Sequence, residues 1–371
     1  MRDLPHKLRV ARGESPADLL LRNARLVNVL SGEIHPADVA VHDGRIIGFG
    51  HYEAVRTIDL ENRFLAPSLI DGHFHVESTL LTVPEVARAV APLGTGALVI
   101  DPHEYANVLG LDGIRYVIES SRGLPVDFFI MLPSCVPDTP LETAGARLTA
   151  DDLRRWTNEE RVAGIAELMN YPGVYLGHEG ELAKIRAGRG HAIDGHAPGL
   201  RGRPLTAYAL AGVRSDHEST DLEEAREKLR LGLHLLLREG STERNLADLL
   251  PLVTPANAPA FSFATDDKLA GDLVRDDAQK AGLGRRAPRE HRVRRVVGGV
   301  EDVDLLEVTL HHDAPRLAGV GVVAVGLEGD TVAGEPGGEL RALRAAEHDL
   351  VVDHREVHRE DVGMVGDRHR K

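Results

Sequence analysis

The stretch 70-IDGHFHVES-78 decides how this chain is interpreted, because it places two histidines one residue apart at the end of an apolar run. The run begins at Phe64 and ends at Ile70. In a β-strand, residues i and i+2 point to the same side, so His73 and His75 can present both imidazoles to one point in space. That geometry is typical of a metal site, although histidines also serve as satisfied core or surface residues. The pattern predicts a strand that ends in a pair of metal ligands.

The residues that follow this stretch alternate between short apolar segments and longer, more polar helical stretches, as far as Asp267. Such alternation is typical of parallel β/α units. One connecting stretch, TDLEEAREKLRLGL, has leucine and alanine at near-helical spacing and predicts an outer helix. The strand candidates are FLAPSLIDGHFH, GALVIDPHE, VDFFIMLPS, VAGIAELMN, HAIDGHAP, AGVRSDHE, LHLLLREGS and APAFSFATDD. The sequence therefore predicts an α/β fold in which residues 67–268 form a TIM-like (β/α)8 barrel.

Residues 1–66 have a different pattern, in which short β-rich runs are separated by turn signals at Ser31-Gly32 and Asp43-Gly44. Asp-Gly between two apolar runs favours a tight hairpin, because both positions tolerate positive φ. We expect a leader followed by a small antiparallel sheet in this N-terminal domain.

The composition changes after Phe263, and residues 269–371 are predicted to form a divergent, irregular or disordered C-terminal tail. No Phe, Tyr, Trp, Ser, Asn, Ile or Cys occurs from Ala264 to Lys371. Almost every residue from Ala281 onward belongs to a set whose codons can begin with G or C. A shifted reading frame in a GC-rich gene would produce this bias, and we hypothesise that the tail arose in that way.

The overall composition excludes several classes of partner. The chain has 371 residues and a formal net charge of -14, and an acidic surface disfavours nucleic acid and anionic membranes. A small-molecule substrate is the better expectation. Cys135 is the only cysteine, so an intrachain disulfide is impossible and a reducing compartment is favoured. The first twenty residues lack the apolar core of a signal peptide, and no later run predicts a membrane span, so we expect a cytoplasmic protein.

Ionisable side chains recur where the predicted strands end, which is where an eight-stranded barrel builds its active site. Imidazole and carboxylate ligands suit zinc, manganese, iron and similar divalent ions. Two such ions would lower the pKa of bound water, so the pattern predicts a metal-dependent hydrolase. The groups at these strand ends are Asp101, His103 and Glu104; Glu167 and Asn170; Asp194 and His196; Asp216, His217 and Glu218; and Asp266 and Asp267.

Several of these segments resemble, in the same order, the adenine deaminases of the amidohydrolase superfamily. The likeness extends from about Val10 to Asp267 and is lost in the tail. It implies a metal-dependent barrel that converts adenine and water into hypoxanthine and ammonia. The segments that carry it are SLIDGHFHVESTLLTVPEVARAV, DPHEYANVLG, LPSCVPDTPLETAGA, AELMNYPGV, DGHAPGLRG, AGVRSDHES, LREGSTERNL and FATDD.

The resemblance also implies roles for individual residues around a binuclear centre, for which it favours Mn²⁺ over Fe²⁺ or Zn²⁺. His73 and His75 would bind the first metal, Glu167 would bridge the two, and His196 and His217 would bind the second. Asp266 would be the last ligand and would also accept the proton of the nucleophilic water. Glu218 would protonate the purine ring, because attack at the amino-bearing carbon makes a neighbouring ring nitrogen more basic. Glu77, Asp101 and His103 would form an additional metal site or would orient the first ligands.

Other features leave alternatives open. Ser134 and Cys135 suggest a nucleophile, but the apolar setting of the cysteine favours a structural role. Arg238, which opens the segment REGS, could contact substrate or form a salt-bridged strand end. At the level of the whole chain, the alternatives to an active adenine deaminase are a catalytically inactive remnant and an amidohydrolase that acts on another cyclic amide or amidine. A homo-oligomer is compatible with the sequence, and the oligomeric state stays open.

Overall fold

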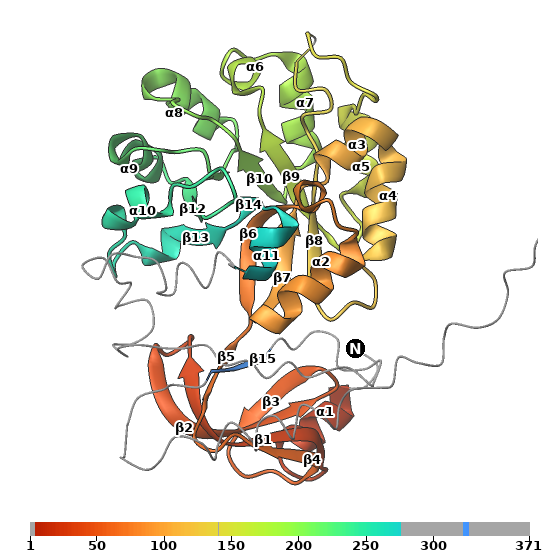
Figure 1. Ribbon diagram of the computed structural model, residues 1–371, viewed down its shortest axis with the longest axis vertical. Helices are drawn as coiled ribbons and strands as arrows, with labels where there is room; N and C mark the ends of the chain where they lie inside the picture. Colours follow the sequence, from red (N-terminus) through yellow and green to blue (C-terminus); the bar gives the residue numbers. More distant parts are fainter. Residues whose placement is uncertain (1–3, 140, 276–321, 326–371) are drawn as a thin grey trace, which may run out of the picture. The chain divides into compact units, whose positions relative to one another are not determined.

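The computed structural model describes residues 4–139, 141–275 and 322–325. Its main part is a curled parallel sheet whose strands alternate with helices (Figure 1). The predicted barrel architecture is confirmed, and the first strand candidate proves to be two strands, because β5 (Phe64–Pro67) ends before β6 begins. The barrel strands are β6 (Leu69–His75), β7 (Thr95–Ile100), β8 (Asp127–Leu132), β9 (Val162–Leu168), β10 (Ala192–Gly195), β11 (Ser215–Asp216), β12 (His234–Arg238), β13 (Phe261–Ala264) and β14 (Asp266–Asp267).

The barrel strands form two parallel ladders, with the orders β10-β9-β8-β7-β6-β14 and β11-β12-β13. The eighth strand candidate joins them, because its first half pairs with β12 and its second half pairs with β6. Thr265 lies between these halves, and its backbone N–H and hydroxyl both donate to the Asp71 carboxylate of β6, at 3.1 and 2.6 Å. This buried contact fixes where Asp266 emerges beside the first strand.

Between β10 and β11 the described residues form no ladder, although the two strands lie very close together. A Cβ added at Gly195 would lie 2.4 Å from the carbonyl oxygen of Ser215. Only glycine permits such an approach of one backbone to another. The close approach keeps the residues after β10 next to those after β11.

Helices follow most of the strands and bury one apolar face against the sheet (Figure 1). Local signals set their starts: α5 begins at a capping box formed by Thr149 and Asp152, and α9 begins at the side-chain cap of Asp221. The α-helices are α2 (Val83–Val90), α3 (His103–Leu109), α4 (Leu111–Ser120), α5 (Ala150–Trp156), α6 (Tyr171–Tyr175), α7 (Glu179–Ala187), α8 (Gly202–Leu210), α9 (Leu222–Arg230), α10 (Leu246–Leu249) and α11 (Ala270–Arg275). The 3-10 helices are η1 (Glu77–Thr79), η2 (Ala91–Leu93), η3 (Leu250–Leu252) and η4 (Ala258–Ala260).

The N-terminal sheet is mixed, so the prediction of an antiparallel sheet was wrong in part. The predicted hairpin is present, with Asp43 and Gly44 at φ values of 48° and 67° between β2 and β3. After that hairpin the chain returns to β1, which pairs antiparallel with β2 but parallel with β4 and β5. The elements are α1 (Leu4–Ala11), β1 (Ala17–Asn28), β2 (Glu33–His42), β3 (Arg45–Phe49), β4 (Ala54–Asp59) and β5 (Phe64–Pro67).

Two elements belong to the region that the sequence assigns to the tail. Helix α11 contributes the buried Leu273 to the main apolar core, and β15 (Val322–Val325) pairs antiparallel with β5. The rest of the predicted tail lies outside the described residues. The hypothesis that a shifted reading frame produced its composition stays a prediction. No helix in the described part of the chain combines the length and apolar character needed to cross a membrane.

Candidate metal centre and active site

The two histidines of the opening stretch point to one place, as their spacing predicts. His73 and His75 are both buried on β6, and their Nε2 atoms lie 3.0 Å apart. The His75 Nδ1 atom lies 3.0 Å from the backbone oxygen of Asp101, which orients its ring. Two ring nitrogens directed at one point create a site that a cation can occupy.

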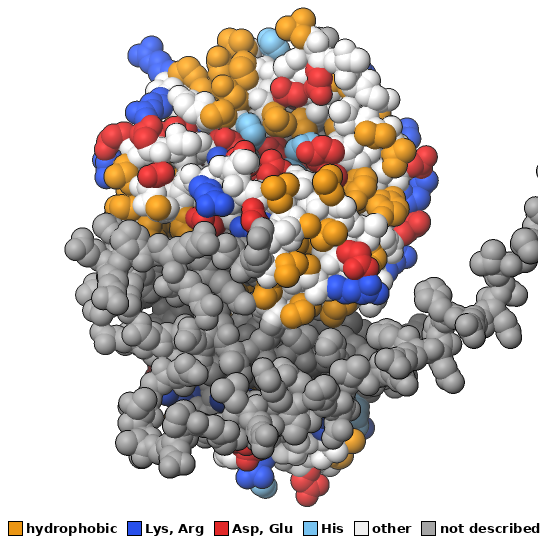
Figure 2. Space-filling view, in the orientation of Figure 1, with side chains coloured by type: hydrophobic (Ala, Val, Ile, Leu, Met, Phe, Trp, Pro, Cys, Tyr) orange, Lys and Arg blue, Asp and Glu red, His pale blue; other side chains and the backbone are white. Residues whose placement is uncertain are grey.

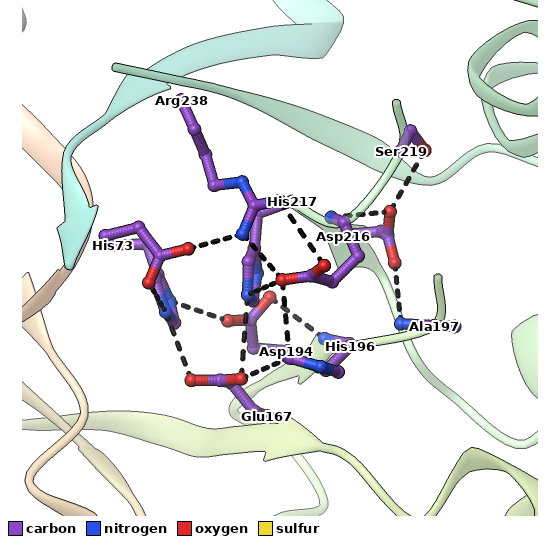
Figure 3. Close-up of polar contacts among 12 residues, drawn as sticks. His73, Glu167, Asp194, His196, Ala197, Asp216, His217, Ser219 and Arg238 are labelled. Carbon is purple, nitrogen blue, oxygen red and sulfur yellow. Dashed lines mark hydrogen bonds and ion pairs between the residues drawn. The ribbon is translucent and has the colours of Figure 1, made fainter. Parts of the chain in front are cut away.

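Glu167 lies at the centre of the cluster, on β9, and its two carboxylate oxygens face different histidines (Figure 3). Oε1 lies 3.2 Å from His73 Nε2 and 3.1 Å from His75 Nε2. Oε2 lies 2.5 Å from His196 Nδ1 and 3.5 Å from His217 Nε2. One carboxylate therefore separates two pairs of imidazoles, which is the arrangement needed to bridge two metal ions.

The second pair of histidines follows β10 and β11. His217 is buried and stacks on His73, with ring centroids 4.1 Å apart and an interplanar angle of 23°. His196 is partly exposed, and its backbone N–H donates to the hydroxyl of Tyr208 at 3.1 Å. The structure thus brings together four histidines from three strand ends.

Asp266 completes this group from β14. Its Oδ1 lies 3.3 Å from His75 Nε2 and 3.8 Å from His73 Nε2. The residue has a φ of 59°, a left-handed conformation that aspartate tolerates better than most residues and that often occurs at functional sites. Glu218 follows His217, and its Oε1 lies 3.4 Å from His217 Nε2 and 3.7 Å from His196 Nδ1.

The electrostatics of the cluster favour bound cations. Burial lowers the pKa of His73, but the neighbouring Glu167 and Asp194 carboxylates together outweigh burial and raise that pKa to about 10. Burial raises the pKa of the Asp266 carboxyl, but the hydrogen bond to His75 and the nearby imidazoles hold it well below its usual range. The raised pKa of His73 reflects nearby carboxylates, whose negative charge favours a compensating cation.

The donor set fits one or more divalent metal ions. Glu167 Oε1 is buried and accepts no hydrogen bond among the described residues, although His73 and His75 lie 3.2 and 3.1 Å away, and His217 Nδ1 is buried without a hydrogen-bond partner there. Several sets of three ligand atoms lie within 4.8 Å of one another, and nitrogen and oxygen donors of this kind suit zinc, manganese or iron. Among these sets are His73, His75 and Asp266; His73, Asp194 and His217; Glu167, His196 and His217; His75, His103 and Glu167; and Asp101, His103 and Cys135.

The three residues predicted for an additional site lie beside the main cluster. His103 Nδ1 is 3.0 Å from Asp101 Oδ2 and 3.7 Å from Glu167 Oε1, so this pair reaches the centre. Glu77 instead accepts a hydrogen bond at 3.1 Å from the backbone N–H of Tyr105 in α3. Burial and the nearby Glu104 carboxylate raise the pKa of Glu77 to about 7.

Ser134 and Cys135 are both buried. The Ser134 hydroxyl donates to the backbone oxygen of Glu167 at 2.5 Å, which supports the strand that carries the central carboxylate. Burial raises the pKa of the Cys135 thiol to about 11, so this thiol is not an activated nucleophile at neutral pH.

Comparison with known proteins shows which family the chain belongs to. Residues 64–273 match the model described as the amidohydrolase family. The chain belongs to the amidohydrolase family. It is 52% identical over 267 residues to the adenine deaminase of Oleidesulfovibrio alaskensis, covering 71% of this chain and 47% of that protein. It is 50% identical over 275 residues to adenine deaminase 2 of Carboxydothermus hydrogenoformans, covering 74% and 48%.

The resemblance to the adenine deaminases seen in the sequence is therefore confirmed, and this amidohydrolase spans about half the length of the curated relatives it matches. Among solved structures, a D-hydantoinase aligns with a TM-score of 0.50 and 15% identity. The alignment covers 70% of this chain and 72% of the hydantoinase, and it supports the fold alone.

The structure of the amidohydrolase adds residues for which the sequence analysis proposed no role. Asp194 Oδ2 lies 3.2 Å from His73 Nδ1, so a carboxylate from β10 orients the first histidine. Lys228 of α9 is fully buried behind the site, although the sequence suggested only an amphipathic outer helix. A signal existed, because Lys228 lies four residues after Glu224 and three after Ala225, on one helical face.

Acidic and histidine side chains also gather on the visible face of the barrel (Figure 2). A separate cavity of about 410 Å³ lies between residues 136–139 and helices α5 and α7. The proposed metal ligands do not line this cavity, so we do not assign the substrate to it.

Proposed function

We propose that this chain is an adenine deaminase that hydrolyses adenine to hypoxanthine and ammonia at a binuclear metal centre. The observation that carries the proposal is the position of Glu167, whose two oxygens face two separate pairs of histidines. The similarity to adenine deaminases at 50 to 52% identity supports the substrate. The chain covers about half of those relatives, so the activity of this polypeptide needs a direct test.

In this proposal, six side chains hold the metal ions. Divalent ions bound there would supply Lewis acidity and make hydroxide available near neutral pH. We favour manganese from the family resemblance, with iron and zinc as alternatives that suit the same donors. The proposed ligands are His73, His75, Glu167, His196, His217 and Asp266.

Two carboxylates handle protons in the proposed reaction. Water adds to the amino-bearing carbon of adenine, and Asp266 accepts the proton that the water loses. Glu218 donates a proton to the adjacent ring nitrogen, because addition at the carbon makes that nitrogen more basic. Asp266 then passes its proton to the amino group, the carbon–nitrogen bond breaks and ammonia leaves, and the remaining hydroxyl proton returns to Glu218, which leaves hypoxanthine.

Asp101 and His103 would orient the main ligands or hold a further ion together with Glu77. Their contacts support the orienting role, because His103 reaches both Asp101 and the central Glu167. Glu77 faces the first turn of α3, so a role in a further ion site would require an ion between these segments.

The first prediction is that the full chain, supplied with Mn²⁺, deaminates adenine and that His73→Ala stops it. Loss of a direct ligand should lower kcat/KM by more than about 100-fold, since even residues that only orient a ligand are worth about 10- to 100-fold. Loss of adenine absorbance and release of ammonia measure turnover, and elemental analysis counts the bound metal.

A matched control is His191→Ala, because His191 is exposed and lies outside the metal cluster. This variant should keep wild-type turnover and metal content. Metal binding without adenine turnover in the wild type would favour an amidohydrolase that acts on another cyclic amide or amidine. Neither metal nor turnover would favour the inactive remnant, and undiminished turnover in His73→Ala would remove the proposed first metal.

A further inference from the structure

The segment LREGSTERNL contains a buried arginine that the proposed chemistry leaves unexplained. Arg238 ends β12 and is 3% exposed. Its Nη1 donates to Glu218 Oε1 at 2.6 Å and to Asp266 Oδ2 at 2.5 Å, and its Nη2 donates to Glu218 Oε2 at 3.3 Å. Figure 3 shows this guanidinium directed into the cluster of site residues. One cation therefore links the two carboxylates that are proposed to move protons.

Asn245, which closes the same segment, holds Arg238 in place. Its carboxamide oxygen accepts from the Arg238 backbone N–H at 2.6 Å. Its amide nitrogen donates to the backbone oxygens of His217 and Ser219, both at 2.9 Å. Glu218 lies between these two residues, so the loop that carries it is tied to the strand end that carries Arg238. Asn245 is 1% exposed, and buried hydrogen bonds of this kind are costly to break.

The carboxylates of Glu218 and Asp266 come from different parts of the barrel, so a group that contacts both is needed to fix their relative positions. Asp266 directs Oδ2 to Arg238 and Oδ1 to His75. Glu218 contacts Arg238 from the loop after β11, on the other side of β12. Without an intervening cation, the buried Asp266 and the partly buried Glu218 carboxylates repel one another, whereas charge-assisted bonds to a planar guanidinium fix both distance and direction.

We propose that Arg238 is a positioning residue that holds the carboxylates of Glu218 and Asp266 at a fixed distance and orientation across the site. The roles of those two carboxylates rest on the proposed function, whereas the positioning itself does not. Arg238 acts through its partners, because Nη1 is occupied by both carboxylates and Nη2 by Glu218. The expected consequence of its loss is a misplacement of proton donor and acceptor, and a misplacement of about 1 Å can cost about 100-fold in rate.

The test uses Arg238→Ala and Arg238→Lys in the full metal-loaded chain, with Arg226→Ala as the control. Arg226 pairs with Glu223 on the outer helix α9, outside the site. We expect Arg238→Ala to lower kcat about 100-fold or more, to change the KM for adenine less than about 3-fold, and to keep the wild-type metal content. Added guanidinium should restore part of kcat by entering the vacated space. Arg238→Lys should recover less than added guanidinium does, because a single ammonium cannot hold both carboxylates in the same geometry.

A second measurement does not depend on turnover. In cobalt-substituted protein, Arg238→Ala should shift the visible absorption of the metal, because Asp266 is freed to rotate, and guanidinium should reverse the shift. If the wild type fails to deaminate adenine, the proposed function falls while the reversible spectral shift still supports the positioning role. Unchanged kcat, a raised KM with unchanged kcat, or a loss of metal and fold that guanidinium does not rescue would each overturn the proposal.

Discussion

The two halves of the barrel are held together by different forces. The half from β6 to β10 is a continuous parallel ladder backed by a large apolar cluster that includes Phe74, Phe128, Ile130 and Ile165. The half from β11 to β13 is a three-stranded parallel ladder with a small buried apolar cluster. That small cluster consists of Ala225, Leu235, Leu237, Leu246 and Leu249.

In the second half, buried polar groups hold the elements together. Lys228 Nζ donates to Asp216 Oδ2 and Glu224 Oε1, both at 2.7 Å, and to the backbone oxygen of Ala197 at 2.8 Å. These bonds tie the residues after β10 and β11 to α9, close to His196 and His217. The comparison indicates that apolar packing backs the strands that carry His73, His75 and Glu167, whereas buried hydrogen bonds and an ion pair hold the segments next to His196 and His217. The second half should therefore be far less tolerant of substitution.

The largest effect on stability should come from Lys228→Met, which keeps the side-chain length and removes the charge. It leaves Asp216 and Glu224 buried without their cation, and breaking a buried pair in this way costs about 3–5 kcal/mol. Urea unfolding measures the loss, and metal analysis should show reduced occupancy because the loops of His196 and His217 are released.

Lys7→Met is the matched control for that variant. Lys7 pairs with Asp43 at 2.5 Å near the N-terminal sheet, where the carboxylate is exposed to solvent, so its removal should cost at most about 1 kcal/mol. Equal destabilisation by the two lysine variants would contradict the proposed difference in how the halves are held.

A smaller effect is expected from Ile130→Val in the apolar half. Ile130 is fully buried in β8, and removing one methylene from such a site costs about 0.5–1.5 kcal/mol. Turnover and metal content should stay at wild-type levels, because packing around the missing atom absorbs the change. A loss of metal in this variant, measured beside unfolding, would show that the apolar half is as sensitive as the polar one.

The smallest effect concerns His234, a half-buried residue of β12 whose Nε2 lies 2.7 Å from Ser262 Oγ. Burial lowers its pKa in the folded state, so below the unfolded pKa of about 6.5 the unfolded chain binds more protons. The stability contributed by neutral His234 is present above that pH and declines as the pH falls through it toward the folded value.

Wild type should therefore lose more stability than His234→Gln between about pH 8 and about pH 5.5, in urea unfolding of both proteins. Comparing the two proteins cancels the titration of the proposed metal ligands, which both proteins share. Parallel losses in wild type and variant would show that His234 is not linked to folding.

The sequence predicted much of this arrangement because several signals are local. The spacing of His73 and His75 in a strand is enough to predict that both face one point. The hairpin at Asp43-Gly44 follows from the backbone preferences of those two residues. The antiparallel assignment of the N-terminal sheet failed because the pairing partners of β4 and β5 depend on where the chain returns, which turn residues do not specify.

By itself, the sequence determined the β/α alternation, the predicted ligand residues and the likeness to a hydrolase family, because periodicity and motif are properties of short segments. Only the tertiary structure decided that Glu167 faces two histidine pairs, that Arg238 links Glu218 to Asp266, and that Lys228 is buried. The contacts of Glu167 with His73 and of Arg238 with Asp266 join residues far apart in the chain. Their distances depend on closure of the barrel, which brings separate strand ends to one edge.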